Sequence, residues 1–250
     1  MVSHFALAAN LCLGHPIRLA YYESGLFYYQ GKGVDVDLVQ ELKRRSSCAM
    51  ETSIMPRVRA YMLLEAGEID IVVAAINTPS RARYAYFAPY LQQRFATIIH
   101  PDVPRAKATL DAFTADPSLH FGVVRGVNYD TPRDNWIEHI STERRLEIAP
   151  NPAILYRMFK GNRLAALFSI PLQYEKELQD IGLRDQVHIV DWFPNQPPTT
   201  RNLALSRHNF NGDQLEAWSA MVTTLRADGT MRSILGHYLT PAEATKALLR

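Results

Sequence analysis

The sequence lacks any apolar run long enough to cross a bilayer, because no window approaches the ~18 consecutive apolar residues that a transmembrane helix needs. It also lacks long tracts of one charge, since 27 Lys and Arg nearly balance 25 Asp and Glu. A basic surface of the kind that binds nucleic acid is therefore not expected. The eight histidines are scattered and the two cysteines are far apart, so we expect no metal site and no other cofactor.

What is present is the composition of a packed globular protein. The chain has 250 residues, of which 47% are hydrophobic and 21% charged. Disordered chains have fewer apolar and more charged residues. A length of this order exceeds what one small core needs, so we expect one large domain or two lobes.

The first ten residues contain an apolar run that ends in Ala6-Leu7-Ala8-Ala9. This run is similar to the end of a secretory signal with its small-residue cleavage site, although it is too short to be a whole signal. We interpret it as the remnant of such a signal; the alternative is an N-terminal segment without function.

Cys12 and Cys48 each come a few residues before a predicted strand. If those two strands are parallel neighbours, both cysteines lie at the same end of the sheet, where a disulfide is sterically possible. A disulfide would indicate an oxidising compartment. The alternative is two unrelated buried thiols.

Strand-like and helix-like periods alternate along the chain. The first hundred residues predict a βαβαβ unit, which favours a parallel sheet with right-handed crossovers. A second, smaller α/β alternation begins at Phe121 and continues to about residue 190. A further strand and two helices close the chain. The predicted strands are 17–21, 51–55, 69–74, 95–99, 121–124, 145–148, 164–168, 187–190 and 202–205, and the predicted helices are 36–45, 57–66, 134–142, 152–159, 172–179, 213–227 and 231–238.

Five segments in this order resemble the amino-acid-binding family, family 3, of type II periplasmic substrate-binding proteins, the receptors of ABC importers. They are Gly33-Val34-Asp35-Val36-Asp37-Leu38, Leu64-Glu65-Ala66-Gly67-Glu68-Ile69-Asp70-Ile71, Asn77-Thr78-Pro79-Ser80-Arg81, Phe87-Ala88-Pro89-Tyr90 and Leu225-Arg226-Ala227-Asp228-Gly229-Thr230. The resemblance covers residues 16–240 and implies a two-lobed α/β fold with the ligand cleft between the lobes. Lobe I would comprise residues 1–98 and 203–250, and lobe II residues 99–202, joined by two hinge strands.

The resemblance implies that Arg81 clamps a ligand carboxylate, which a planar guanidinium does with two parallel hydrogen bonds. Thr78 can cap the helix that begins at Pro79 and still present its hydroxyl. Ala75 and Asn77, in the same loop, are further expected ligand contacts.

Four tyrosines and Phe27 surround Glu23 in the loop 21–29. Aromatic walls with one carboxylate suit a ligand with an apolar or cationic portion. We predict that Tyr22 and Glu23 contact the ligand, whereas other rings of this loop fill the core. Arg57, after the second strand, is predicted to face the cleft or, equally, the surface.

In lobe II we expect ligand contacts from Gly126, Val127, Asn128 and Ser169. The first three follow a strand and precede a helix, where backbone N–H groups can receive an anion. These positions depart from the family, which has hydroxyl residues after the glycine and an acidic residue for the ligand ammonium where Ser169 stands. Ile76 likewise replaces a hydroxyl residue. Either Glu23 compensates or the ligand has no α-ammonium, because a buried ammonium without a partner is costly.

We therefore expect a periplasmic binding protein, secreted by an N-terminal signal, that captures a small carboxylate-bearing ligand by hinge closure. It would deliver this ligand to the membrane permease of an ABC transporter, as in amino acid transport. The alternatives are a ligand-sensing receptor module and, less favoured, a dehydratase-type enzyme on the same fold. No nucleophile, base and orienting residue form a set, so we expect no enzyme activity.

Overall fold

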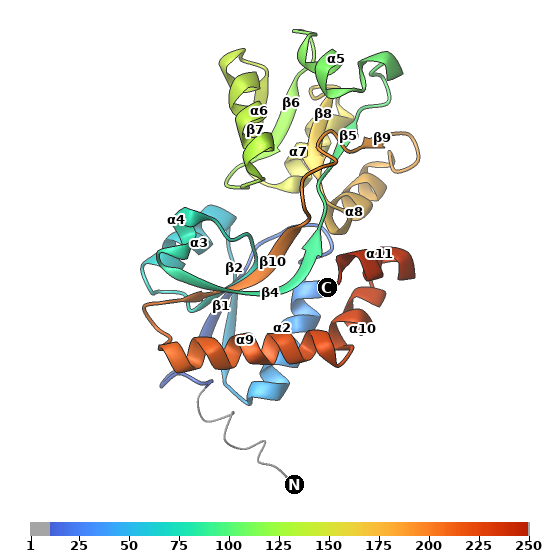
Figure 1. Cartoon of the computed structure of the whole chain (residues 1–250). Helices are drawn as coiled ribbons and strands as arrows, with labels where there is room; N and C mark the ends of the chain where they lie inside the picture. The colour runs from blue at the N-terminus through green and yellow to red at the C-terminus, as the bar shows by residue number, and fades with distance from the viewer. Residues whose placement is uncertain (1–10, 250) are drawn as a thin grey trace. The chain divides into compact units, whose positions relative to one another are not determined.

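The computed structural model describes residues 11–249, and the proposed signal remnant, residues 1–10, lies outside them. The chain divides into two compact units (Figure 1). The first unit contains the chain up to Gln93 and the chain from Thr200 onward, and the second unit spans Arg94–Thr199. The first boundary lies five residues before the one expected from the sequence. The reason is that strand β5 (Ala96–Ile99) pairs with β8 (Ala166–Ser169) and β9 (His188–Val190) of the second sheet.

A five-stranded sheet in the order β2-β1-β3-β10-β4 forms the centre of the first unit. β1 pairs in parallel with both β2 and β3, which confirms the βαβαβ unit expected from the sequence. β10 inserts between β3 and β4 and runs antiparallel to β3. These strands are β1 (Ile17–Tyr21), β2 (Met50–Ile54), β3 (Ile71–Ala75), β4 (Ala85–Gln93) and β10 (Thr199–Ser206).

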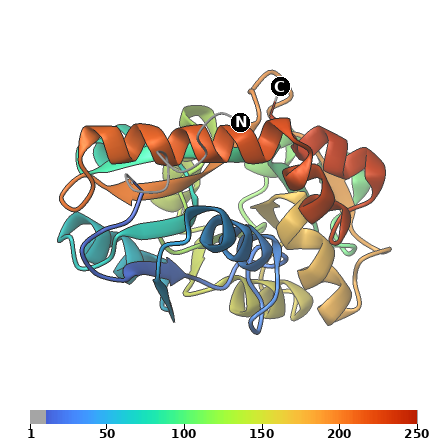
Figure 2. The same ribbon diagram turned by 90° about the horizontal axis from the view of Figure 1, so that it is seen from below.

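Helices cover this sheet, and the longest of them, α9 (Gly212–Ala227), runs along β4 (Figure 2). Asn211 and Gln214 form a capping box that fixes where α9 begins. Leu11, the first residue that the structure describes, contacts the same helix, because Trp218 Nε1 donates to the Leu11 carbonyl at 3.0 Å. The other helices of this unit are α2 (Val34–Ser46), α3 (Arg57–Glu65), α4 (Pro79–Ala82), α10 (Thr230–Gly236) and α11 (Pro241–Ala247).

A disulfide joins Cys12 to Cys48, with their Cα atoms 5.3 Å apart. It connects the segments that lead into β1 and β2, which are parallel neighbours with Ile17 opposite Met50. The predicted pairing is therefore confirmed, for the geometric reason that predicted it. A disulfide persists in an oxidising compartment, so this feature agrees with a protein that acts outside the cytoplasm.

The second unit has its own five-stranded sheet, in the order β7-β6-β8-β5-β9. β6 (Phe121–Val124) pairs in parallel with β7 (Leu146–Ala149) and β8, whereas β5 runs antiparallel to β8 and β9. Its helices are α5 (Leu110–Thr114), α6 (Thr131–Thr142), α7 (Pro152–Lys160) and α8 (Pro171–Ile181), with a 3-10 turn η1 at Arg105–Lys107.

Large apolar side chains of strands and helices form the core of the second unit. Among them are Tyr156 and Phe159 of α7, Leu167 of β8 and Leu178 of α8, each fully buried. Gly122 of β6 allows this close packing, because an added Cβ would meet Leu155 Cδ1 at 2.7 Å. Within residues 11–249, no helix combines the length and the apolarity that a bilayer span requires.

Candidate ligand-binding site

The carboxyl ends of β1, β2 and β3 meet at one edge of the first sheet, where open α/β sheets bind their ligands. Tyr22 directly follows β1, Arg57 begins α3 after β2, and Arg81 lies in α4 after β3. β10 starts at this same edge, because it is antiparallel to β3 and places Asn202 opposite Ala75. The topology thus brings together residues that are far apart in the sequence.

Local capping fixes the position of Arg81. Thr78 is the N-cap of α4 and its Oγ1 accepts a hydrogen bond from the Arg81 N–H at 3.3 Å, with Pro79 at the first helical position. The Arg81 side chain is buried, with its guanidinium 3.7 Å from the centroid of the Tyr61 ring. One guanidinium nitrogen, Nη1, donates to the Ile76 carbonyl at 3.1 Å. The backbone and an aromatic face therefore hold this arginine in place.

Arg57 and Tyr22, both predicted from the sequence, lie in contact. The guanidinium of Arg57 is 4.4 Å from the centroid of the Tyr22 ring, and Tyr22 is buried with its hydroxyl donating to the Ala74 carbonyl at 2.8 Å. Arg57 Nε is buried and has no hydrogen-bond partner. A buried N–H donor without a partner is uncommon in folded proteins and calls for an explanation.

Ala74, the residue before the last one of β3, has a positive φ of 51°. A positive φ is unfavourable for alanine and needs support from the surrounding structure. Two tyrosine hydroxyls supply it: Tyr22 donates to the Ala74 carbonyl, and the Ala74 N–H donates to the Tyr90 hydroxyl at 3.0 Å. Tyr90 in turn donates to Asp35 Oδ1 at 2.5 Å.

Burial raises the pKa of Asp35 to about 7, against the hydrogen bond from Tyr90 and the positive charge of Arg201, which both lower it. Asp35 is fully enclosed at the start of α2, so its charged form loses hydration that one hydroxyl does not fully replace. Near neutral pH this carboxyl is therefore divided between its protonated and ionised forms.

Arg201 is a residue of this edge that the sequence analysis did not include. Its side chain is buried, and burial lowers its pKa to about 10; the nearby positive charge of Arg57 also lowers it. Arg57, Arg81 and Arg201 all act electrostatically on Tyr61, whose pKa is nevertheless raised by burial. The available signal was its position directly before the predicted strand 202–205.

Three other predicted residues of this unit differ in exposure. Glu23 and Asn77 are exposed, whereas Ala75 is buried within β3 opposite Asn202. The Asn202 amide donates to the Ala75 carbonyl at 2.9 Å, so Ala75 helps to position the end of β10.

The predicted residues of the second unit also lie at one sheet edge, because β6 and β8 are parallel neighbours. Gly126 follows β6 with φ of 75°, and Val127 and Asn128 are half-buried. Ser169, at the end of β8, is buried and accepts a hydrogen bond from the Tyr156 hydroxyl at 2.8 Å. Its hydroxyl thus already serves the core of this unit.

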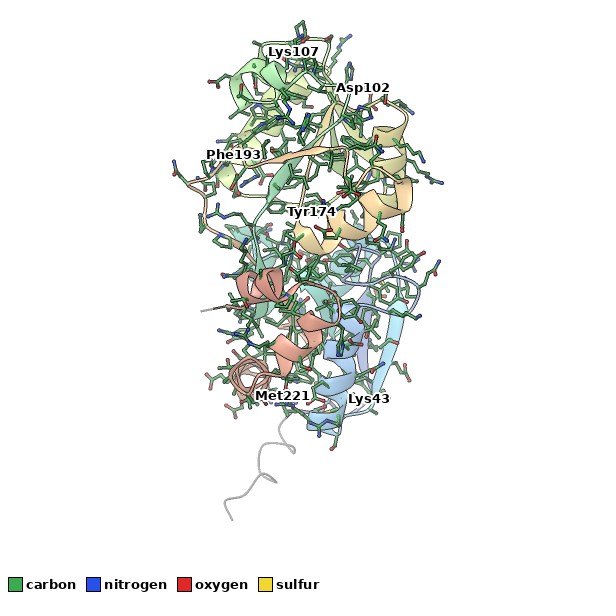
Figure 3. The ribbon with its side chains drawn as sticks, turned by 90° about the vertical axis from the view of Figure 1, so that its right-hand side faces the viewer. Lys43, Asp102, Lys107, Tyr174, Phe193 and Met221 are labelled. Atoms are coloured by element: carbon green, nitrogen blue, oxygen red, sulfur yellow. A yellow bond between two sulfur atoms is a disulfide. The ribbon has the colours of Figure 1, made fainter. Side chains whose placement is uncertain are left out.

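A pocket of about 410 Å³ opens elsewhere in the second unit. Asp102 and Lys107, labelled in Figure 3, are among the residues that line it. Polar side chains of its lining are already paired, since Asn162 donates to Asp102 at 2.6 Å and Lys107 pairs with Asp116. We do not assign this pocket a ligand. Across the described residues, no three His, Cys, Asp or Glu side chains gather as metal ligands.

Residues 18–241 match the family model of bacterial extracellular solute-binding proteins, family 3. The chain belongs to this family. The family identity confirms the resemblance found in the sequence, and the two five-stranded α/β sheets agree with its two-lobed fold. No curated protein matches the sequence.

Solved structures of family 3 and related receptors share this fold at low sequence identity. The arginine-, lysine-, histidine-binding protein ArtJ of Geobacillus stearothermophilus has a TM-score of 0.72 at 12% identity, over 90% of this chain and 95% of that one. A histidine kinase sensor domain similar to periplasmic binding proteins gives a TM-score of 0.72 at 16% identity, over 90% and 96% of the two chains. An ancestral amino acid-binding protein, a precursor of cyclohexadienyl dehydratase, gives a TM-score of 0.71 at 14% identity, over 95% of this chain and 99% of that one.

Proposed function

We propose that this family 3 protein is a periplasmic receptor that captures a small carboxylate-bearing molecule and delivers it to the permease of an ABC transporter. The observation that carries the proposal is Arg81. Its guanidinium is buried at the carboxyl end of β3 and stacked on Tyr61, and its backbone is fixed by the Thr78 cap.

A guanidinium that stacks on an aromatic ring uses its flat face for that contact. Its N–H groups lie in the guanidinium plane, where they can donate to a carboxylate. The positive charge persists when water is excluded, since arginine does not lose its proton in proteins. Arg81 therefore suits a ligand carboxylate better than a neutral ligand. Tyr22 and Arg57, at the same edge, are the further contacts that we propose in this unit.

We propose that the ligand need not be a standard amino acid. Ser169 replaces the acidic residue that the resemblance assigns to the ligand ammonium, and its hydroxyl accepts from Tyr156 instead. Val127 and Asn128 stand where hydroxyl residues are usual. Deaminated acids and other small carboxylates therefore belong beside L-amino acids in a ligand search.

A thermal-shift screen with these compounds tests the proposal. A ligand at ~100 times its Kd adds about 2.7 kcal/mol to the stability of the folded protein. For a chain of this size, that raises Tm by roughly 5 to 10 °C. We expect Arg81→Ala to bind the same ligand at least about a hundredfold more weakly, because the variant leaves a carboxylate without its charged partner.

The matched control is Arg83→Ala, since Arg83 caps the same short helix but is exposed and bonds only to the Ser80 carbonyl among the contacts described. Full affinity in Arg81→Ala would rule out the carboxylate clamp. Equal losses in both variants would assign the effect to α4 rather than to the guanidinium.

A sensor module is the second candidate, and the observation that favours it is the likeness to a histidine kinase sensor domain over 90% of the chain. A sensor would bind its ligand through the same sheet edge. Only the partner would differ, so crosslinking of the ligand-bound protein in its native membrane distinguishes a permease from a kinase. A dehydratase activity is less favoured, because Glu23, the acid or base that it would need, is exposed.

A further inference from the structure

β2 (Met50–Ile54) is an outer strand of the first sheet, because β1 is its only neighbour in the strand order. Figure 3 shows it, as a pale blue arrow, at the margin of this unit. All of its residues are exposed or half-buried, and Ile54 is 60% exposed. An outer strand presents a row of N–H and C=O groups with which another strand can pair.

The backbone groups that point away from β1 can be assigned from the hydrogen bonds at the two ends of β2. The Ala49 carbonyl accepts from β1 at 2.8 Å, and the Met55 N–H donates to β1 at 3.1 Å. Because successive residues of a strand direct these groups to opposite sides, Met50, Thr52 and Ile54 direct theirs outward. Among residues 11–249, no hydrogen bond reaches the outward groups.

A second copy of the same strand fits this row. Two antiparallel β2 strands related by a two-fold axis at Thr52 place Thr52 opposite Thr52 and Met50 opposite Ile54. Each of these facing pairs exchanges two hydrogen bonds, so every outward group is paired. An axis at any other residue leaves some of them unpaired. Glu51 then lies opposite Ser53, so no like charges face each other directly.

The outer strand β7 of the second sheet does not offer this fit. The Arg145 and Ala149 carbonyls both accept from the β6 side, so Leu146 and Ile148 direct their backbone groups outward. An axis that uses both lies at Glu147 and places two Glu147 carboxylates directly opposite each other, which is unfavourable.

The two remaining outer strands are protected in other ways. β4 contains Pro89, which has no N–H to donate, and Gln92 Nε2 of the same strand donates to the Leu248 carbonyl at 3.0 Å. The chain after α11 therefore lies against β4. β9 has only three residues, and short outer strands offer little to pair with.

We propose that β2 pairs with β2 of a second copy of this chain, in the register centred on Thr52, and joins the two first sheets into one. Ile54, exposed in the single chain, then packs against Met50 of the second copy. One strand pair buries less surface than a stable dimer needs. We therefore expect a weak, reversible dimer with a Kd on the order of 0.1 mM.

Sedimentation velocity of the whole chain, from about 10 µM to about 1 mM, tests the proposal. We expect the average mass to rise with concentration from that of one chain toward that of two. Ile54→Lys should weaken this association at least about tenfold, because it puts a charge into the apolar pair. Ile148→Lys is the matched control, since Ile148 is 53% exposed on β7 and should have no effect.

A double variant tests the register. Met50→Glu together with Ile54→Lys puts opposite charges on facing positions of the two copies, whereas within one strand the positions are about 13 Å apart. We expect each single change to weaken the dimer and the double variant to recover it. Thr52→Pro removes an outward N–H, keeps the bonds to β1 and should abolish the dimer. Circular dichroism and urea unfolding establish that each variant is folded.

The mass of a single chain at every concentration would overturn the proposal. Association that folded Ile54→Lys and Thr52→Pro leave unchanged would do so as well, because the contact would then lie elsewhere. A double variant no better than its single changes would contradict the register. None of these results bears on the proposed function, since no ligand takes part.

Discussion

At the scale of single residues, Ala74 combines a positive φ with hydrogen bonds from both of its backbone groups to tyrosine hydroxyls, those of Tyr22 and Tyr90. The chain from Ala74 through Tyr90 to Asp35 ends on a fully buried carboxyl with a pKa of about 7. Such a group links stability to pH, because its proton affinity differs between the folded and the unfolded chain.

Replacing Asp35 by Asn tests this link. Folded Asp35 keeps its proton up to about pH 7, whereas the unfolded group loses it near pH 4, so between these values the folded state holds more protons. Stability from this group is therefore complete below about pH 4 and declines as the pH rises to about 7. When the pH is raised from 5 to 8, the wild type should lose about 2 to 3 kcal/mol more than Asp35→Asn.

Urea unfolding at the two pH values measures the difference. Asp213→Asn, an exposed carboxyl of the same unit, serves as the control and should follow the wild type. Parallel pH profiles for the wild type and Asp35→Asn would show that Asp35 is already ionised when folded.

Residues whose role depends on a local motif could be predicted from the sequence, and those whose role depends on strand order could not. Thr78, Pro79 and Arg81 form a helix start that is recognisable in one turn of chain. Arg201 reaches the same edge only because β10 inserts between β3 and β4, which no local pattern records. The contact between Tyr61 and Arg81 could not be predicted for a similar reason, because nothing in the sequence of α3 indicates which of its side chains packs against an arginine.

At the scale of elements, the sequence predicted the parallel strands best. β1, β2 and β3 are short strand-like segments separated by helical periods, and their pairing followed from right-handed crossovers. β4 (Ala85–Gln93) was not predicted as a strand, because Pro89 and a mixed aromatic pattern obscure its alternation. The structure places β4 at the sheet edge, where a proline costs little.

The disulfide joins two elements, and its removal should weaken their unit. It closes a loop between residues 36 apart in sequence, for which chain entropy predicts about 4 kcal/mol of stabilisation. We expect the double variant Cys12→Ser, Cys48→Ser to lose about 2 to 4 kcal/mol in urea unfolding. The wild type with reductant is the matched comparison. Unchanged stability in both would show that other contacts, such as the hydrogen bond from Trp218 to the Leu11 carbonyl, hold this segment without the disulfide.

At the scale of the whole molecule, the proposed function requires the two units to move when ligand binds. Hinge closure shifts an equilibrium only if the ligand binds the closed form more tightly. We expect small-angle X-ray scattering to give a smaller radius of gyration with saturating ligand than without it. Arg81→Ala under the same conditions should show no change, and equal radii for the free and ligand-bound wild type would argue against closure.

The order of the first sheet also has a consequence for how the protein is made. β4 leaves the ribosome more than a hundred residues before β10, the strand that lies between it and β3. Until Thr199–Ser206 arrives, β3 and β4 each have an unpaired edge, whereas the sheet of the second unit is encoded in one continuous stretch. Because domains fold as units during synthesis, the second unit can complete its fold first. The sheet edge that carries Arg57, Arg81 and Arg201 then assembles last, since Arg201 arrives with β10.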